Sequence, residues 1–142
     1  MVTPDANILL YAYNVGDERH SDAKKWLEDS LSSDDIFALN WQAVTAFLRI
    51  ASHPRSFPRP YSLPQITSIV QEWLDCENVI TIAPTPRHWA ILQEQIREGQ
   101  TTGPLMMDAH LAALAIEHDA TLATTDRDFS RFSAVKTVNP LK

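Results

Sequence analysis

Residues 1–12 read MVTPDANILLYA, a pattern that predicts a short strand and then a helix, with one aspartate, Asp5, between them. Two later stretches repeat this pairing of an apolar segment with an aspartate at its edge: GPLMMDAHLAALA (103–115) and TLATTDRDF (121–129). Their aspartates are Asp108 and Asp126. A carboxylate loses hydration beside apolar residues, and this loss is unfavourable unless a partner compensates for it. The placement of these three residues therefore needs a chemical reason.

Length and composition favour a single domain, residues 1–142, with its own core. Hydrophobic residues make up 44% of the chain, and a chain of this size buries roughly two thirds of its unfolded surface. The one cysteine, Cys76, has no partner for an internal disulfide, which suits a reducing compartment. No apolar run approaches the ~18 residues of a membrane span, and the N-terminus lacks the features of a signal peptide. We therefore expect a cytoplasmic protein with no membrane partner, and its net charge of −6 argues against indiscriminate nucleic-acid binding.

Apolar periodicity predicts helices and strands in alternation. We expect strands at Val2–Asp5, Ile36–Leu39, Asn78–Ala83, Thr121–Ala123 and Val135–Val138. We expect helices at about Asn7–Tyr13, Ser21–Leu31, 41–52, Pro64–Cys76, Pro86–Gly99 and Met106–His118, with Asn40 as the cap of the third. Strands separated by helices predict an α/β fold, in which a mostly parallel sheet has helices on both faces.

Parallel strands bring the three aspartates toward one edge of the sheet. Asp5 ends the first strand and Asp126 follows the fourth, and functional side chains gather beyond the carboxyl ends of such strands. Asp108 lies in the first turn of an apolar helix, on the face of Leu111, so we expect it to point inward. Taken alone, each residue also has an ordinary role: Asp5 as a helix cap, Asp108 as a partner of the helix dipole, and Asp126 or Asp128 as a turn residue. These roles do not explain why all three fall at one edge.

Converging carboxylates repel one another unless they take up protons or share a cation. Oxygen ligands at a partly open site suit Mg²⁺ or Mn²⁺, which keep water molecules and accept phosphate oxygens of a substrate. A bound ion of this kind polarises a phosphodiester and generates a nucleophile from water. Zinc is not favoured, because the five histidines show no ligand spacing and Cys76 stands alone. The residues therefore indicate a magnesium or manganese site that acts on phosphodiesters.

Four stretches of the sequence together carry a resemblance to a known family: PDANILLYA, WQAVTAFLRIASHPRSFPRP, DAHLAALA and TDRDF. In this order they resemble the motifs of PIN-domain nucleases, in particular the VapC-type toxins of type II toxin–antitoxin pairs, and the likeness runs from residue 1 to about 132. The resemblance implies a PIN-like α/β/α sandwich and a metal-dependent endoribonuclease. It also implies a homodimer held inactive by a cognate antitoxin, and an RNA substrate for which tRNA is one candidate.

By match of motif, the resemblance gives roles to five residues. Asp5 corresponds to the first metal ligand, with Asn7 bracing the loop. Asp108 corresponds to the second ligand, and Asp126 to a ligand that acts directly or through water. Asp128 is the fourth acidic member. The four carboxylates are thus candidate ligands of Mg²⁺ or Mn²⁺, and Asp5, Asp108 and Asp126 are the candidate catalytic residues.

One position departs from the family's pattern. Many PIN domains carry a glutamate in the third helix, just before an FLR-like run, and here TAFLRI has Ala46 in that place. No acidic residue occurs anywhere from Ile36 to Gln71. Gln42, one turn earlier, is a candidate neutral ligand that acts directly or through water. The site therefore has three or four negative groups, which bears on its metal affinity and its activity.

The acid-free window, residues 36–71, is the candidate RNA-binding region. It carries a local charge of +3 from Arg49, Arg55 and Arg59. Phe57 and Tyr61 are interleaved with the arginines, as suits phosphate contacts together with base stacking. The alternative is a proline-stiffened loop whose aromatic rings pack against the core or a second subunit, with Arg49 as a structural residue of its helix.

Two other functions stay open. One is a degenerate PIN fold that binds RNA or an antitoxin without cutting, for which Ala46 is the strongest argument. The other is a different metal-dependent phosphoesterase, such as a haloacid-dehalogenase-like phosphatase. That class normally has an aspartate two residues after its nucleophile, where this chain has Asn7. RNA cleavage separates the enzyme from the first alternative, and aryl-phosphate cleavage separates it from the second.

Overall fold

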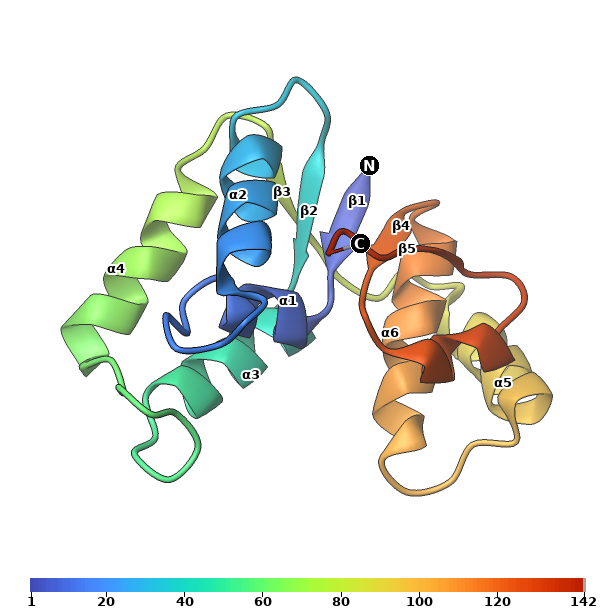
Figure 1. The fold of residues 1–142 in the computed structure, drawn as a ribbon. Helices are drawn as coiled ribbons and strands as arrows, with labels where there is room; N and C mark the ends of the chain where they lie inside the picture. The colour runs from blue at the N-terminus through green and yellow to red at the C-terminus, as the bar shows by residue number, and fades with distance from the viewer. Residues whose placement is uncertain (142) are drawn as a thin grey trace.

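Five short parallel strands form one sheet within residues 1–141, the part of the chain that the computed structural model describes (Figure 1). The strands are β1 (Val2–Pro4), β2 (Phe37–Asn40), β3 (Val79–Ile82), β4 (Thr121–Ala123) and β5 (Lys136–Val138). Their order is β3-β2-β1-β4-β5, and every neighbouring pair is parallel. The chain therefore extends the sheet outward from β1 on one side and then from β4 on the other. The carboxyl ends of β1 and β4 form the switch point, the place at which open α/β sheets bind ligands.

Helices cover both faces of the sheet (Figure 1). Residues 1–141 contain six α-helices and one 3₁₀ helix: α1 (Ala6–Tyr11), α2 (His20–Leu31), α3 (Trp41–Ala51), α4 (Leu63–Leu74), α5 (His88–Gly99), α6 (Leu105–Glu117) and η1 (Arg127–Arg131). One layer holds α1–α4, and the other holds α5, α6 and η1. This arrangement confirms the predicted α/β/α sandwich with a parallel sheet. None of these helices, all within residues 1–141, has the length and apolar character that crossing a membrane requires.

The core has two main clusters, one beneath each group of helices. The larger cluster lies beneath α1–α4, and its fully buried side chains include Leu9, Phe37, Phe47 and Trp73. The smaller cluster lies beneath α5, α6 and η1, and it includes Leu111, Leu122, Phe129 and Phe132. Each large buried apolar side chain contributes about 1.5–3 kcal/mol. The larger cluster therefore supplies most of the stability of the fold.

Most predicted elements are confirmed to within one or two residues at their ends. Helix α1 ends at Tyr11, two residues early, because the ring of Tyr13 turns into the larger cluster. There its hydroxyl accepts a hydrogen bond from Trp73 Nε1 at 3.0 Å. The 3₁₀ helix η1 was not expected, because its five residues are too few to display an apolar period.

Asn40 ties the end of β2 to the end of β1 and also caps α3. Its side-chain oxygen accepts a hydrogen bond from Ala43 N at 2.8 Å, which confirms the predicted cap. Its Nδ2 donates to Thr3 Oγ1 at 2.8 Å and to the Pro4 carbonyl at 2.9 Å. The side chain is fully buried. One amide therefore fixes β1 against the start of α3, at the sheet edge where the aspartates gather.

Replacing Asn40 with alanine removes a helix cap and leaves two buried groups unpaired. We expect Asn40→Ala to lower the free energy of unfolding by about 2–4 kcal/mol. Ser62 caps α4 at an exposed site, so the matched variant Ser62→Ala removes a cap alone and lowers it by about 1 kcal/mol. Denaturant unfolding of the wild type and both variants measures the difference. Equal losses would show that the buried hydrogen bonds of Asn40 contribute nothing.

Candidate active site

Asp5 and Asp126 leave neighbouring strands at the switch point of the sheet. Asp5 follows β1, and its backbone N–H donates to the Ala123 carbonyl of β4 at 2.9 Å. Thr124, the first residue after β4, donates its hydroxyl to Asp5 Oδ2 at 2.8 Å. The same hydroxyl oxygen accepts a hydrogen bond from the backbone N–H of Asp126 at 3.0 Å. One buried threonine therefore holds both aspartates in register.

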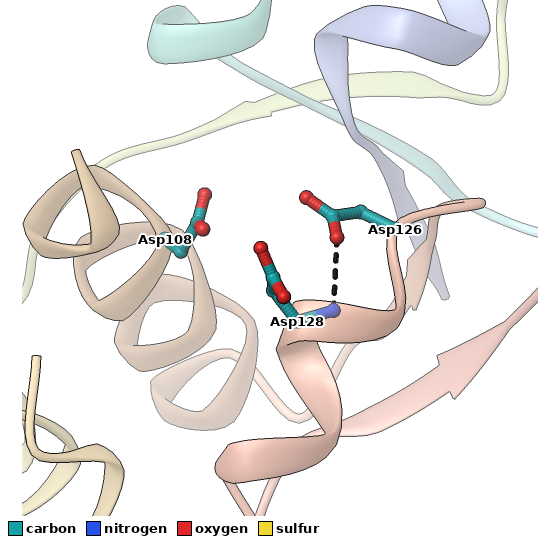
Figure 2. Close-up of side chains that lie close together, drawn as sticks. All are labelled: Asp108, Asp126 and Asp128. Atoms are coloured by element: carbon teal, nitrogen blue, oxygen red, sulfur yellow. Dashed lines mark hydrogen bonds between the residues drawn. The ribbon is translucent and has the colours of Figure 1, made fainter.

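Asp126 also begins η1. Its Oδ1 accepts a hydrogen bond from the backbone N–H of Asp128 at 2.8 Å, drawn as the dashed line in Figure 2. The turn role considered for Asp126 is thus confirmed. Its second carboxylate oxygen is directed toward the side of Asp108 (Figure 2). Asp126 can therefore cap the turn with one carboxylate oxygen and take part in a carboxylate cluster with the other.

Asp108 completes the cluster from the first turn of α6. One carboxylate oxygen from each of Asp108, Asp126 and Asp128 lies within 4.8 Å of the other two. We call these three residues the acidic triad. Asp5 lies beside it, joined to Asp126 through Thr124, and its charge acts on Asp108. The structure therefore brings Asp108, Asp126 and Asp128 together, and it joins Asp5 to Asp126 through Thr124.

The pKa of Asp108 rises from an ordinary value of 3.8 to about 6, chiefly because the side chain is partly buried. Repulsion from the carboxylates of Asp126, Asp5 and Asp128 adds to the rise, and the Arg131 cation opposes it. An isolated carboxylate in the first turn of a helix would shift the other way, because the helix dipole favours its charged form. Burial and repulsion therefore outweigh the dipole at this residue.

Burial also raises the pKa of Asp5. The Thr124 hydroxyl and the backbone N–H of Ala6 oppose this rise, and the charge of Asp126 adds to it. Asp5 stands at the N-cap position of α1, but its side chain makes no hydrogen bond of capping geometry there. Its carboxylate is turned to Thr124 instead, so the ordinary cap role does not account for Asp5.

The acidic triad has the chemistry of a site for a hard divalent cation. Octahedral Mg²⁺ holds oxygen ligands about 2.1 Å from the ion, which places neighbouring ligands about 3 Å apart. The triad oxygens, within 4.8 Å of one another, need only small side-chain movements to reach one ion. Within residues 1–141 the set contains carboxylates alone, with no histidine or cysteine. Oxygen ligands of this kind suit Mg²⁺ or Mn²⁺.

Gln42, the candidate neutral ligand, is hydrogen-bonded to the backbone of α6. Its Nε2 donates to the Met107 carbonyl at 3.2 Å, while its Oε1 is buried without a hydrogen-bond partner in the described chain, residues 1–141. Gln42 therefore links α3 to α6 one residue before Asp108. Asn7, predicted to brace the loop, is exposed in the first turn of α1.

The predicted RNA-binding aromatic residues are only partly available. Phe57 is 5% exposed and belongs to the larger core cluster, so the prediction that it stacks on bases is wrong. Tyr61 is half-buried, and its hydroxyl donates to the Tyr13 carbonyl at 3.0 Å. Arg55 and Arg59 are exposed in the loop between α3 and α4. The alternative of inward-packed aromatic rings is thus correct for Phe57, and the two arginines keep access to solvent.

Two residues that sequence reasoning missed support the site. Thr124 joins Asp5 to Asp126, as described above. Arg131 donates through Nε to the Asp128 carbonyl at 3.2 Å and through Nη1 to the Gly99 carbonyl at 2.9 Å, which holds η1 against the end of α5. Neither residue has a sequence signal of its own, because each acts through contacts that only the fold creates.

The model of the PIN domain family matches residues 2–135 of this chain. The chain therefore belongs to the PIN domain family.

Within that family the similar curated proteins are bacterial ribonucleases. Ribonuclease VapC37 of Mycobacterium tuberculosis is 41% identical over 138 residues, which cover 96% of this chain and 94% of that protein. Ribonuclease VapC33 of the same organism is 35% identical over 142 residues, covering 100% and 99%. The fold resembles VapBC-1 from nontypeable Haemophilus influenzae, with a TM-score of 0.69, 16% identity and full coverage of both chains. It also resembles VapBC2 from Rickettsia felis bound to a promoter DNA fragment, with a TM-score of 0.67, 20% identity and 98% coverage of both chains.

The raised pKa of Asp108 predicts a stability effect of definite sign. Its pKa is higher in the folded chain than in the unfolded chain, so its charge destabilises the metal-free fold above about pH 6, and this penalty fades as the pH falls toward about 4. In chelator at about pH 7, we expect Asp108→Asn to melt roughly 2–4 °C above the wild type, after allowance for solvent screening. Mg²⁺ should stabilise the wild type more than the variant, because a ligand of the native state adds stability by mass action.

The control for this measurement is Asp34→Asn, which removes one charge at an exposed position at the amino-terminal end of β2. It should leave both the melting temperature in chelator and the Mg²⁺ response close to those of the wild type. If Asp108→Asn is less stable than the wild type in chelator, Asp108 stabilises α6 through the helix dipole and the repulsion argument is wrong.

Proposed function

We propose that this protein is a metal-dependent endoribonuclease and the toxin of a toxin–antitoxin pair. The observation that carries the proposal is the acidic triad, whose three carboxylate oxygens lie within 4.8 Å of one another at the switch point of a PIN-domain sheet. The similar curated proteins carry the name ribonuclease. The solved structures with this fold include a toxin–antitoxin complex from Klebsiella pneumoniae.

Asp108, Asp126 and Asp128 would hold Mg²⁺, or Mn²⁺ in its place, with Asp5 as the adjoining fourth carboxylate. Such an ion, when bound, polarises a phosphodiester and lowers the pKa of a bound water. The chain's own contribution is orientation. Thr124 fixes the carboxylate of Asp5, and the backbone N–H of Asp128 fixes that of Asp126. Carboxylates oriented in advance lose less entropy when the site forms around its substrate.

RNA is the proposed substrate, with tRNA as one candidate. Arg55 and Arg59 project from the loop after α3, in a window of sequence without acidic residues, and they are the proposed phosphate contacts. Half-buried Tyr61, at the edge of the same loop, is the proposed stacking surface for a base. The proposed partners are a cognate antitoxin and a second copy of the chain, and the proposed location is the cytoplasm.

Loss of the Asp5 or the Asp108 carboxylate should abolish cleavage. Asp5→Asn and Asp108→Asn each remove a charge that would hold the ion, so we expect no RNA cleavage by either variant and none by the wild type in chelator. Addition of Mg²⁺ or Mn²⁺ should restore the wild type alone. The exposed control Asp34→Asn should cleave at the wild-type rate. Gel analysis of a structured RNA measures all four.

Cleavage by Asp5→Asn or Asp108→Asn at the wild-type rate would contradict the assignment, and so would full activity in chelator. Binding of RNA by the wild type without any cleavage would favour the degenerate PIN fold, for which Ala46 provides the sequence argument.

The arginine loop makes a separate prediction about salt. If Arg55 and Arg59 contact phosphates, changing both to alanine should weaken RNA binding and flatten the plot of log affinity against log salt by roughly 0.7 per contact. Cleavage of a saturating substrate should change little. The matched control replaces Lys24 and Lys25 with alanine, which removes the same charge from α2 and leaves the loop intact. An unchanged slope together with an altered dimer equilibrium would make this loop a subunit contact.

A further inference from the structure

A hollow of about 670 Å³ lies between α3 and α6. Its walls include Trp41, Ala46 and Arg49 from α3, and Met107 and His110 from α6. We call it the α3–α6 hollow. Ala46 stands where many PIN domains carry a glutamate, so a small neutral side chain lines the hollow in place of a carboxylate. The hollow therefore has more room and less negative charge than a glutamate would leave.

A buried carboxylate supports the α6 wall of the hollow through two histidines. The Glu117 side chain is fully buried and pairs with His88 Nδ1. His88 Nε2 is 3.0 Å from His110 Nδ1, and the two rings meet edge to face. The functions considered above use none of these three groups.

Glu117 and His88 therefore hold the ring of His110 from its Nδ1 side. The ring itself lines the hollow.

The α3 wall offers a stacking surface and a positive charge. Trp41, the first residue of α3, is 48% exposed, and Arg49 is exposed two turns further along the helix. Within residues 1–141 Arg49 makes no ion pair, because no carboxylate lies near enough. An exposed aromatic plane and an unpaired cation are groups that recognise a nucleotide. Met107, which lines the hollow, directly precedes Asp108 of the acidic triad along α6.

We propose that the α3–α6 hollow binds one nucleobase of the RNA strand next to the scissile phosphate. Trp41 stacks on the base, Arg49 contacts the adjoining phosphate, and the ring of His110 packs against the base from the α6 side of the hollow. This inference rests on the proposed function, and the competing occupant is a second copy of the chain.

The first test compares two exposed tryptophans. Trp41 lines the hollow, whereas Trp89, 63% exposed on α5, does not line it. In chelator, which prevents cleavage, Trp41→Ala should weaken the affinity for a short single-stranded oligoadenylate by roughly tenfold or more, since loss of one base stack has that effect. Trp89→Ala should bind like the wild type. Fluorescence anisotropy measures both affinities, and Arg49→Gln provides a second variant on an exposed face, with an expected loss of affinity and a shallower salt dependence.

The second test concerns the ring of His110. His110→Ala removes the ring from the wall of the hollow, so it should weaken the affinity for oligoadenylate, whereas His110→Phe keeps a ring there and should retain most of that affinity. Wild-type affinity in His110→Ala would overturn the role of His110.

Self-association separates the two occupants. Sedimentation should give the same oligomeric state for the wild type, Trp41→Ala and Trp89→Ala. A change of that state in Trp41→Ala, with unchanged RNA affinity per subunit, would overturn the subsite and assign the hollow to a second copy. Wild-type affinity in both Trp41→Ala and Arg49→Gln would also overturn it, even if the protein cleaves RNA. Absence of RNA cleavage by the wild type with Mg²⁺ would overturn the proposed function, and with it the subsite.

Discussion

The parallel pairing of β1 with β4 is the constraint on which the site depends. These strands come from opposite ends of the chain, yet they run in register from Val2 opposite Thr121 to Pro4 opposite Ala123. The Asp5 N–H continues the ladder one step beyond the strands. A shift of one residue in a strand turns every side chain to the opposite face. The register of β1 and β4 therefore places Asp5 within hydrogen-bond distance of Thr124, and it places the turn that begins at Asp126 beside them.

Repulsion within the site is tolerable because most of the core lies elsewhere. The larger cluster, beneath α1–α4, contains the most massive buried side chains, Trp73 and Phe47 among them. Asp108 and the η1 aspartates belong to the other layer, whose smaller cluster surrounds Phe129 and Phe132. Arg131 anchors η1 to the end of α5 and moderates the charge at Asp108. The acidic residues are thus carried by the layer that contributes less to folding.

The fold class and the four aspartates could be predicted because both leave local marks in the sequence. Apolar periods mark the elements, and an acid at the edge of an apolar run marks each aspartate. The supporting contacts leave no such mark: Thr124 meets Asp5 across 119 positions, and Glu117 meets His88 across 29. Phe57 shows a second limit of prediction from sequence. An aromatic residue between arginines has the same local pattern whether it binds RNA or packs in the core. Only packing distinguishes the two.

Ala46 changes more than the number of ligands. A further carboxylate about 4 Å from another would add on the order of 4 kcal/mol of repulsion before screening, at an effective dielectric constant of about 20. That amount is a large part of the ~5–15 kcal/mol that separates a folded domain from its unfolded chain. With alanine at this position of α3 the ion-free chain avoids the extra repulsion. At this sheet edge the ion-free chain therefore folds with less repulsion than a chain with a glutamate at this position would meet.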